Sequence, residues 1–131
     1  MTKEPRHIGD GTPMNVWIDE MIPRAPYDDV PMGMWQIVND GRAGFGLEGE
    51  ALANYIRKSI HALMDAGFKP VRGAGKPDRW QLQSQYGSNK HEVAEAVIAE
   101  WLRDGAPTPK PWTGLWFGLP RHYLSERSGR S

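Results

Sequence analysis

The side chains best suited to chemistry gather between residues 57 and 90. Seven lysines and arginines lie there against two aspartates, with Trp80 and Tyr86 among them. A basic hairpin with aromatic side chains can neutralise phosphates and stack on bases. The zero net charge of the chain argues against a dedicated nucleic-acid-binding protein, and the alternative is a solvated face that balances the acidic first half. We therefore keep nucleic-acid binding by the 68–90 hairpin as a second hypothesis, carried by Arg72, Lys76, Arg79, Trp80 and Tyr86.

The segment after residue 105 combines prolines with aromatic residues. Pro107, Pro109 and Pro111 alternate with other residues, which favours an extended conformation. The aromatic side chains that follow cannot all stay exposed at little cost. Either the segment wraps the domain as a strap, the interpretation that we favour for its packing, or it offers an apolar patch to a protein partner or a second copy of the chain. The residues of that partner-binding patch would be Trp112, Trp116 and Phe117.

Metal-ligand residues are sparse in this sequence. There is no cysteine, which excludes disulfides and thiolate metal sites, and the four histidines lie far apart along the chain. His91 and Glu95 are four residues apart, so they could form half of a metal site on one helix face. A helix-surface ion pair is the simpler interpretation of that spacing. We predict no metal site.

Two glycine-rich stretches invite a cofactor interpretation. Residues 44–49 spell the G-x-G-x-x-G pattern of dinucleotide-binding loops. The strand predicted before them ends too early, at Asn39, and the chain after them is too short for a full Rossmann domain. Residues 73–76 resemble a P-loop only superficially, because positions 70 and 77 are both proline. We predict no cofactor and explain these glycines by backbone conformation.

No set of residues in the sequence indicates catalysis. The adjacent carboxylates Asp19 with Glu20 and Asp28 with Asp29 could act as acid and base, but such pairs are usually solvated surface or turn residues. We predict no catalytic residues. The leading hypothesis is a small non-catalytic binding or regulatory module that acts through protein contacts. A small enzyme whose site cannot be read from sequence is the third hypothesis.

Two long helices must position these residues. Over residues 47–66, apolar residues recur at spacings of three and four, which places them on one helix face. Residues 89–104 show a similar pattern, and Asn89 followed by Glu92 resembles a capping box. Gly67 and Gly105 follow the two helices directly and suit the left-handed conformation after a helix end.

Four strands are predicted, at residues 15–22, 34–39, 68–72 and 79–86. With the two helices they give the order strand, strand, helix twice, although chance is an alternative to a true duplication. We expect an α+β fold, with a four-stranded, mostly antiparallel sheet and both helices on one face (ββα-ββα). The C-terminal strap of proline and aromatic residues would follow this arrangement.

Length and composition set the domain organisation. A chain of 131 residues with 39% hydrophobic and 24% charged residues fits one folded domain. We expect a flexible N-terminal arm at 1–14, a single α+β domain at 15–124 and a disordered tail at 125–131. No apolar run approaches the length of a membrane span, and the N-terminus lacks the apolar core of a signal peptide. We therefore expect a cytoplasmic protein with no membrane association.

Overall fold

The computed structural model describes residues 6–24, 32–73, 80–108, 110 and 114–119. Helices and short strands alternate along the chain, and two single helical turns lie among them. In chain order the elements are α1 Met14–Arg24, β1 Met32–Gly33, α2 Met34–Asn39, a π-helical turn Asp40–Gly44, α3 Gly49–Asp65, β2 Lys69–Gly73, β3 Trp80–Leu82, a 3-10 turn Ser84–Tyr86, α4 Lys90–Arg103 and β4 Trp116–Gly118.

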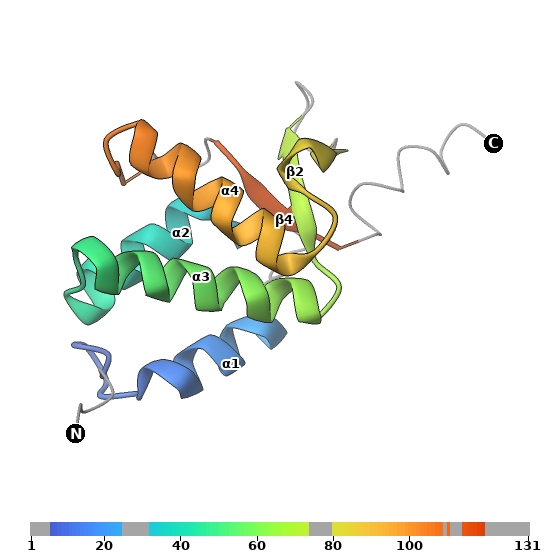
Figure 1. Ribbon diagram of the computed structural model, residues 1–131. Helices are drawn as coiled ribbons and strands as arrows, with labels where there is room; N and C mark the ends of the chain where they lie inside the picture. The colour runs from blue at the N-terminus through green and yellow to red at the C-terminus, as the bar shows by residue number, and fades with distance from the viewer. Residues whose placement is uncertain (1–5, 25–31, 74–79, 109, 111–113, 120–131) are drawn as a thin grey trace.

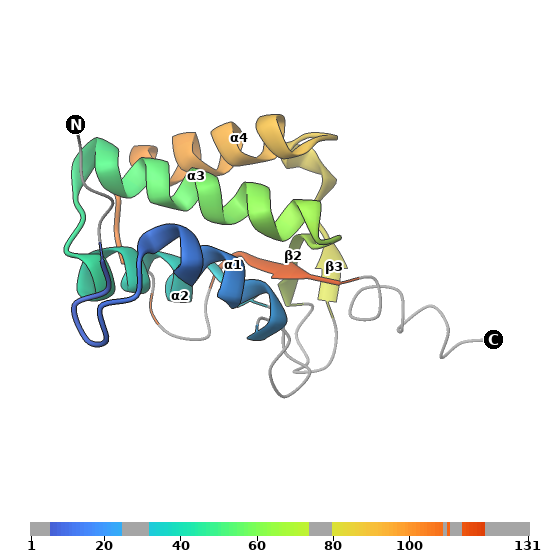
Figure 2. The ribbon, with the colours of Figure 1, turned by 90° about the horizontal axis from the view of Figure 1, so that it is seen from below.

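Helix α3 is the centre of the molecule. It contacts α1, α2 and α4, with α4 along one side and α1 along the other (Figure 1). The view turned by 90° shows α3 and α4 in one layer, with α2 and the sheet beneath them (Figure 2). The expected α+β class, with a four-stranded antiparallel sheet, is confirmed.

The sheet has four strands in the order β1-β4-β2-β3, and every pairing is antiparallel. One of its two inner strands, β4, comes from the proline and aromatic segment, which is therefore a strap that closes the domain. In the register, Phe117 lies opposite Met32 on one side and opposite Pro70 on the other. Residues more than 80 positions apart in the chain are thus neighbours in the sheet.

Two of the four predicted strands are wrong. Residues 15–22 lie in α1 and residues 34–39 form α2, so the ββα-ββα order does not occur. In α1 the buried residues are Met14 and Ile18, four apart, while Val16 between them is 42% exposed. A strand would bury alternate residues, whereas a helix buries every third or fourth. The β-branched residues Val16 and Ile18 favour a strand by propensity, but the segment packs with the helical spacing of its buried side chains.

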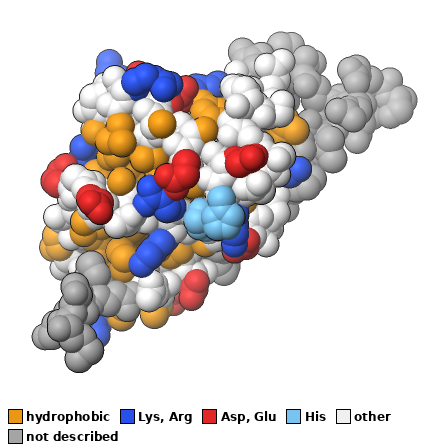
Figure 3. Space-filling model, in the orientation of Figure 1, with side chains coloured by type: hydrophobic (Ala, Val, Ile, Leu, Met, Phe, Trp, Pro, Cys, Tyr) orange, Lys and Arg blue, Asp and Glu red, His pale blue; other side chains and the backbone are white. Residues whose placement is uncertain are grey.

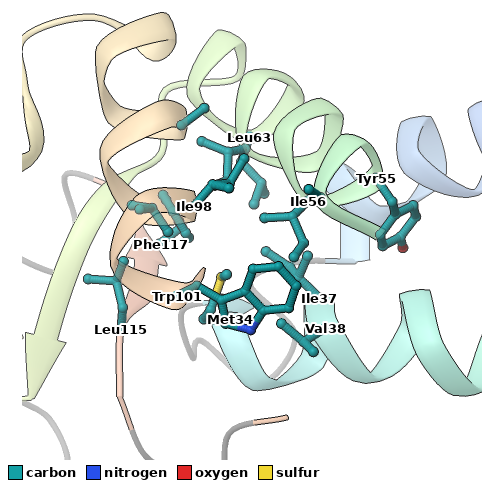
Figure 4. Close-up of a cluster of buried hydrophobic side chains, with 14 of the residues drawn as sticks. Met34, Ile37, Val38, Tyr55, Ile56, Leu63, Ile98, Trp101, Leu115 and Phe117 are labelled. Carbon is teal, nitrogen blue, oxygen red and sulfur yellow. The ribbon is translucent and has the colours of Figure 1, made fainter. Parts of the chain in front are cut away.

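The helices predicted at 47–66 and 89–104 are confirmed as α3 and α4. Leu52, Ile56 and Leu63 of α3 are fully buried, and Val97 and Trp101 of α4 are nearly so. Figure 4 shows side chains of both helices pointing into one cluster with residues of α2 and β4. The two apolar faces therefore share a single core, as the sequence pattern indicates.

Both long helices end in the same hydrogen-bond pattern. After α3, the N–H of Phe68 donates to the carbonyl of Leu63 at 3.0 Å, and Gly67 has φ +100°. After α4, the N–H of Ala106 donates to the carbonyl of Trp101 at 2.9 Å, and Gly105 has φ +93°. These bonds satisfy carbonyls that the helix leaves without partners, and the positive φ explains the glycines.

The capping box predicted at the start of α4 is half formed. Asn89 Oδ1 accepts the backbone N–H of Glu92 at 3.0 Å, as expected for an N-cap. The carboxylate of Glu92 reaches one residue further back and accepts the N–H of Ser88 at 2.8 Å. The strand predicted at 79–86 is also shorter than expected, because β3 ends at Leu82 and a 3-10 turn follows.

Arg42, in the π-helical turn after α2, contacts the segment that follows α4. Its guanidinium donates to the carbonyl of Ala106 and to Thr108 Oγ1, both at 2.7 Å, and pairs with Glu48 at 3.1 Å. The N–H of Met34 donates to the carbonyl of Leu115 at 2.9 Å, just before β4. The start of the strap is thus fixed by polar contacts before its aromatic residues enter the core.

The N-terminal arm predicted at 1–14 is described only from residue 6. In that part, the ring of His7 stacks on Trp17 at a centroid distance of 4.2 Å, and Ile8 donates its N–H to the carbonyl of Gly44. Residues 6–13 therefore contact the domain. Residues 1–5 and the tail predicted at 125–131 lie outside the described residues, so their disorder stays a prediction.

Candidate functional site

The sheet ends at β3, and the outer edge of this strand has no neighbour among the described strands. Gln83 donates its N–H to the carbonyl of Pro70 at 2.8 Å, so residues 81 and 83 turn their backbone groups towards β2. Bonded positions alternate along an antiparallel pair. The N–H and carbonyl groups of Trp80 and Leu82 therefore point away from the sheet and could pair with another strand.

A cleft of about 510 Å³ lies next to β3, between the hairpin and the N-terminal end of α4. Leu82, from β3 itself, is 43% exposed and forms part of the cleft wall. Apolar residues of β2 and of both long helices form the rest of its apolar lining, namely Met64, Pro70 and Val93. The cleft therefore offers an apolar surface next to the strand whose outer edge is unpaired among the described residues.

The polar lining of the cleft comes from the turn before α4. Glu92 Oε1 accepts hydrogen bonds from the N–H and the Oγ of Ser88, at 2.8 and 3.1 Å. These hydrogen bonds lower the pKa of the Glu92 carboxyl group, so it is ionised at neutral pH. A Cβ atom at residue 87 would lie only 2.5 Å from the Cβ of Glu92. Such a contact is a collision, so glycine is required there. Lys69 also lines the cleft and balances the charge of Glu92.

Two residues of the predicted nucleic-acid site meet in one hydrogen-bond network. Arg72 Nη2 donates to the Tyr86 hydroxyl group at 3.0 Å, and that hydroxyl group donates to Glu100 Oε1 at 2.8 Å. Arg72 and Glu100 also form an ion pair at 3.7 Å. Burial, the largest cause, raises the pKa of Tyr86, so its phenol stays protonated.

This network borders a second, smaller cavity of about 220 Å³. One cation, Arg72, faces the carboxylates of Glu100 and Asp104 across apolar walls that include Trp101. The balance of charge in this cavity is therefore negative and unsuited to a phosphate group. Glu100 is the residue that sequence reasoning missed, because nothing in its local pattern distinguishes it from a solvated helix residue.

The remaining predicted site residues have different surroundings. Trp80 packs edge-on against Trp116 at a centroid distance of 5.2 Å. Trp116 and Phe117, expected as partner-binding residues, are 4% and 0% exposed in β4, and burial there leaves them no surface to offer. Residues 74–79, with Lys76 and Arg79, and residues 111–113, with Trp112, lie outside the described residues. Nucleic-acid binding by the hairpin loop thus stays a prediction.

The sequence motifs that we set aside have structural roles. The glycine-rich stretch 44–49 follows a helical turn, and a side chain on Gly44 would lie 2.9 Å from His7. Glu95 pairs with Arg57, whose Nη2 lies 3.0 Å from Glu95 Oε1, and this ion pair lowers the pKa of the Glu95 carboxyl group. In the described part of the chain, no three histidine or carboxylate side chains converge as a metal site.

No protein-family model, curated protein or solved structure is significantly similar to this chain. The described helices include none that is long and apolar enough to cross a bilayer. Function must therefore be argued from the geometry of the chain itself.

Proposed function

We propose that this chain is a non-catalytic binding module that receives an extended segment of a protein partner at the outer edge of β3. The partner strand would pair with the outward N–H and carbonyl groups of Trp80 and Leu82. One of its apolar side chains would enter the cleft of about 510 Å³ beside Leu82. In this mode of recognition, backbone hydrogen bonds supply affinity and side-chain pockets supply specificity.

The observation that carries the proposal is the outer edge of β3, which no other strand in the described part of the chain covers. Exposed edge strands usually carry a charge, a proline or a bulge that prevents pairing with other chains. The three residues Trp80, Gln81 and Leu82 include neither charge nor proline. The other outer strand, β1, is only two residues long, and both residues are buried. β3 is therefore the edge of the sheet at which a further strand can be added.

The lining of the cleft supports an uncharged apolar side chain as its occupant. Lys69 and Glu92 oppose each other in charge, so the cleft has no net charge to attract an ion. Its apolar wall is formed by Leu82, Met64 and Val93. Burying an aliphatic side chain against such a wall contributes about 1.5–3 kcal/mol. We expect the partner segment to be a β-prone stretch with a leucine, isoleucine, valine or methionine at the cleft.

Selection from a random peptide library, displayed on phage against the full chain, tests this proposal. The variant Leu82→Pro removes the outward N–H of β3, while the inward bonds of residues 81 and 83 stay possible. The variant Leu82→Ala keeps the N–H and removes only the side chain. We expect selected peptides to bind at least about tenfold more weakly to Leu82→Pro, which corresponds to the loss of a hydrogen bond and an apolar contact.

The matched control is Leu102→Ala, because Leu102 is 55% exposed on α4 and does not line the cleft. This variant should bind the selected peptides as the unmodified chain does. Failure to enrich any peptide, or equal binding to the Leu82→Pro variant, would overturn the proposal. If gel filtration showed a dimer and Leu82→Pro dissociated it, the partner strand would belong to a second copy of this chain.

A further inference from the structure

Two histidines that are 30 residues apart in the chain meet on the face formed by α3 and α4. The rings of His61 and His91 lie with centroids 4.9 Å apart and planes at 77°. Figure 3 shows histidine side chains together on this face, flanked by both basic and acidic side chains. This cluster lies apart from the β3 cleft, since neither histidine lines that cleft.

The ring nitrogen Nε2 of His61 is buried and has no hydrogen-bond partner among the described residues. A buried polar atom without a partner costs about 1–3 kcal/mol. The ring of His61 is in edge contact with the ring of His91, so the unpartnered nitrogen belongs to a ring that already touches a second imidazole. An imidazole nitrogen that is not protonated has a lone pair, which binds either a hydrogen-bond donor or a metal ion.

We propose that His61 and His91 together bind a divalent transition-metal ion between α3 and α4. With metal–nitrogen distances of about 2.0–2.1 Å and metal angles of roughly 90–110°, two imidazoles bound to one ion have centroids about 4.5–5.2 Å apart. The observed distance of 4.9 Å falls within this range. The packing of α3 on α4 therefore brings the two rings to a centroid distance compatible with a shared ion.

Two carboxylates beside the histidine pair already have partners. Asp65 and Glu95 each lie one helical turn beyond a histidine. Their carboxylates pair with Lys90 at 2.9 Å and with Arg57 at 3.0 Å, so they are outer neighbours rather than ligands.

The protein supplies two ligands, because no third histidine or carboxylate among the described residues converges with them. Water would complete the coordination, so the site selects ions that favour imidazole, such as Zn²⁺, Ni²⁺ or Cu²⁺. Mg²⁺ and Ca²⁺ prefer oxygen ligands and should not bind here.

Calorimetric titration of the untagged full chain with ZnCl₂ and with NiCl₂ tests the proposal, and MgCl₂ is the control ion. We expect one equivalent of Zn²⁺ or Ni²⁺ to bind. Replacing even an outer neighbour of a metal ligand costs about 10–100-fold in affinity, so His61→Asn and His91→Ala should each lower the affinity at least about tenfold. The imidazole resonances of His61 and His91 should shift on addition of Zn²⁺.

The control variant is His7→Gln, because His7 stacks on Trp17 away from this face and should leave the affinity unchanged. His91 is exposed, so a thermal melt of His91→Ala should show an intact fold. Absence of heat on titration, or an affinity in both His61→Asn and His91→Ala equal to that of the unmodified chain, would overturn the proposal. Neither result would bear on peptide binding at β3, because the two sites share no residue.

Discussion

The helices α3 and α4 differ from the sheet in how far apart in the sequence their residues lie. Each helix is a continuous run of 17 or 14 residues, ended by the same glycine turn. The sheet is assembled from four strands of two to five residues, contributed by distant parts of the chain. The helices are local structures that then pack, whereas the sheet exists only once the chain has closed.

The sheet itself contrasts a closed centre with an open edge. Phe117 in the inner strand β4 is fully buried, while Leu82 in the edge strand β3 is 43% exposed. The inner strand therefore contributes a buried side chain to the core, whereas the edge strand presents an exposed side chain to solvent. Two sets of changes test this division and a third tests the helix ends, and we give them from the largest expected effect to the smallest.

Deleting residues 106–131 should have the largest effect, because it removes β4 and with it the link between β1 and β2. We expect loss of cooperative unfolding in a thermal melt followed by circular dichroism, with part of the helical signal retained. Deletion of residues 125–131 alone is the control and should leave the melt unchanged. If the longer deletion melted cooperatively at the same temperature, the helices would be independent of the sheet.

Replacing one residue at the centre and one at the edge should separate the two roles. Phe117→Ala should lower the free energy of unfolding by about 3–5 kcal/mol, since it empties a fully buried aromatic site. Leu82→Ala should change it by no more than about 0.5 kcal/mol, because the side chain is largely exposed. Urea unfolding measures both. A large loss of stability for Leu82→Ala would mean that the edge of the sheet is part of the core.

The two glycine turns should respond alike, because their geometry is alike. Gly67 and Gly105 have φ of +100° and +93°, and a Cβ at either position would meet no atom closer than 3.8 Å. Gly67→Ala and Gly105→Ala should therefore each cost only the backbone strain of a left-handed residue, about 1–2 kcal/mol. Equal losses in urea unfolding would support two equivalent helix ends. An effect below the error of measurement at both sites would refute the role of these turns.

The candidate site was only partly accessible to sequence reasoning. The sequence placed Arg72 and Tyr86 in one basic hairpin, and the structure does bring them together. It gave no sign that Glu100 of α4 would complete their network and neutralise Arg72. The open edge of β3 was equally hidden, because the outermost strand is known only when the strand order is known. Likewise, His61 and His91 become neighbours only through the packing of α3 on α4.

What the sequence determined by itself was the two long helices, their glycine ends and the α+β class. Those features depend on residues within four positions of each other, so the period of the apolar side chains encodes them directly. The tertiary structure alone decided that residues 15–22 and 34–39 are helical and that the aromatic strap supplies an inner strand of the sheet. A strand of three residues has too short a pattern to be read, and its burial depends on partners brought from elsewhere in the chain.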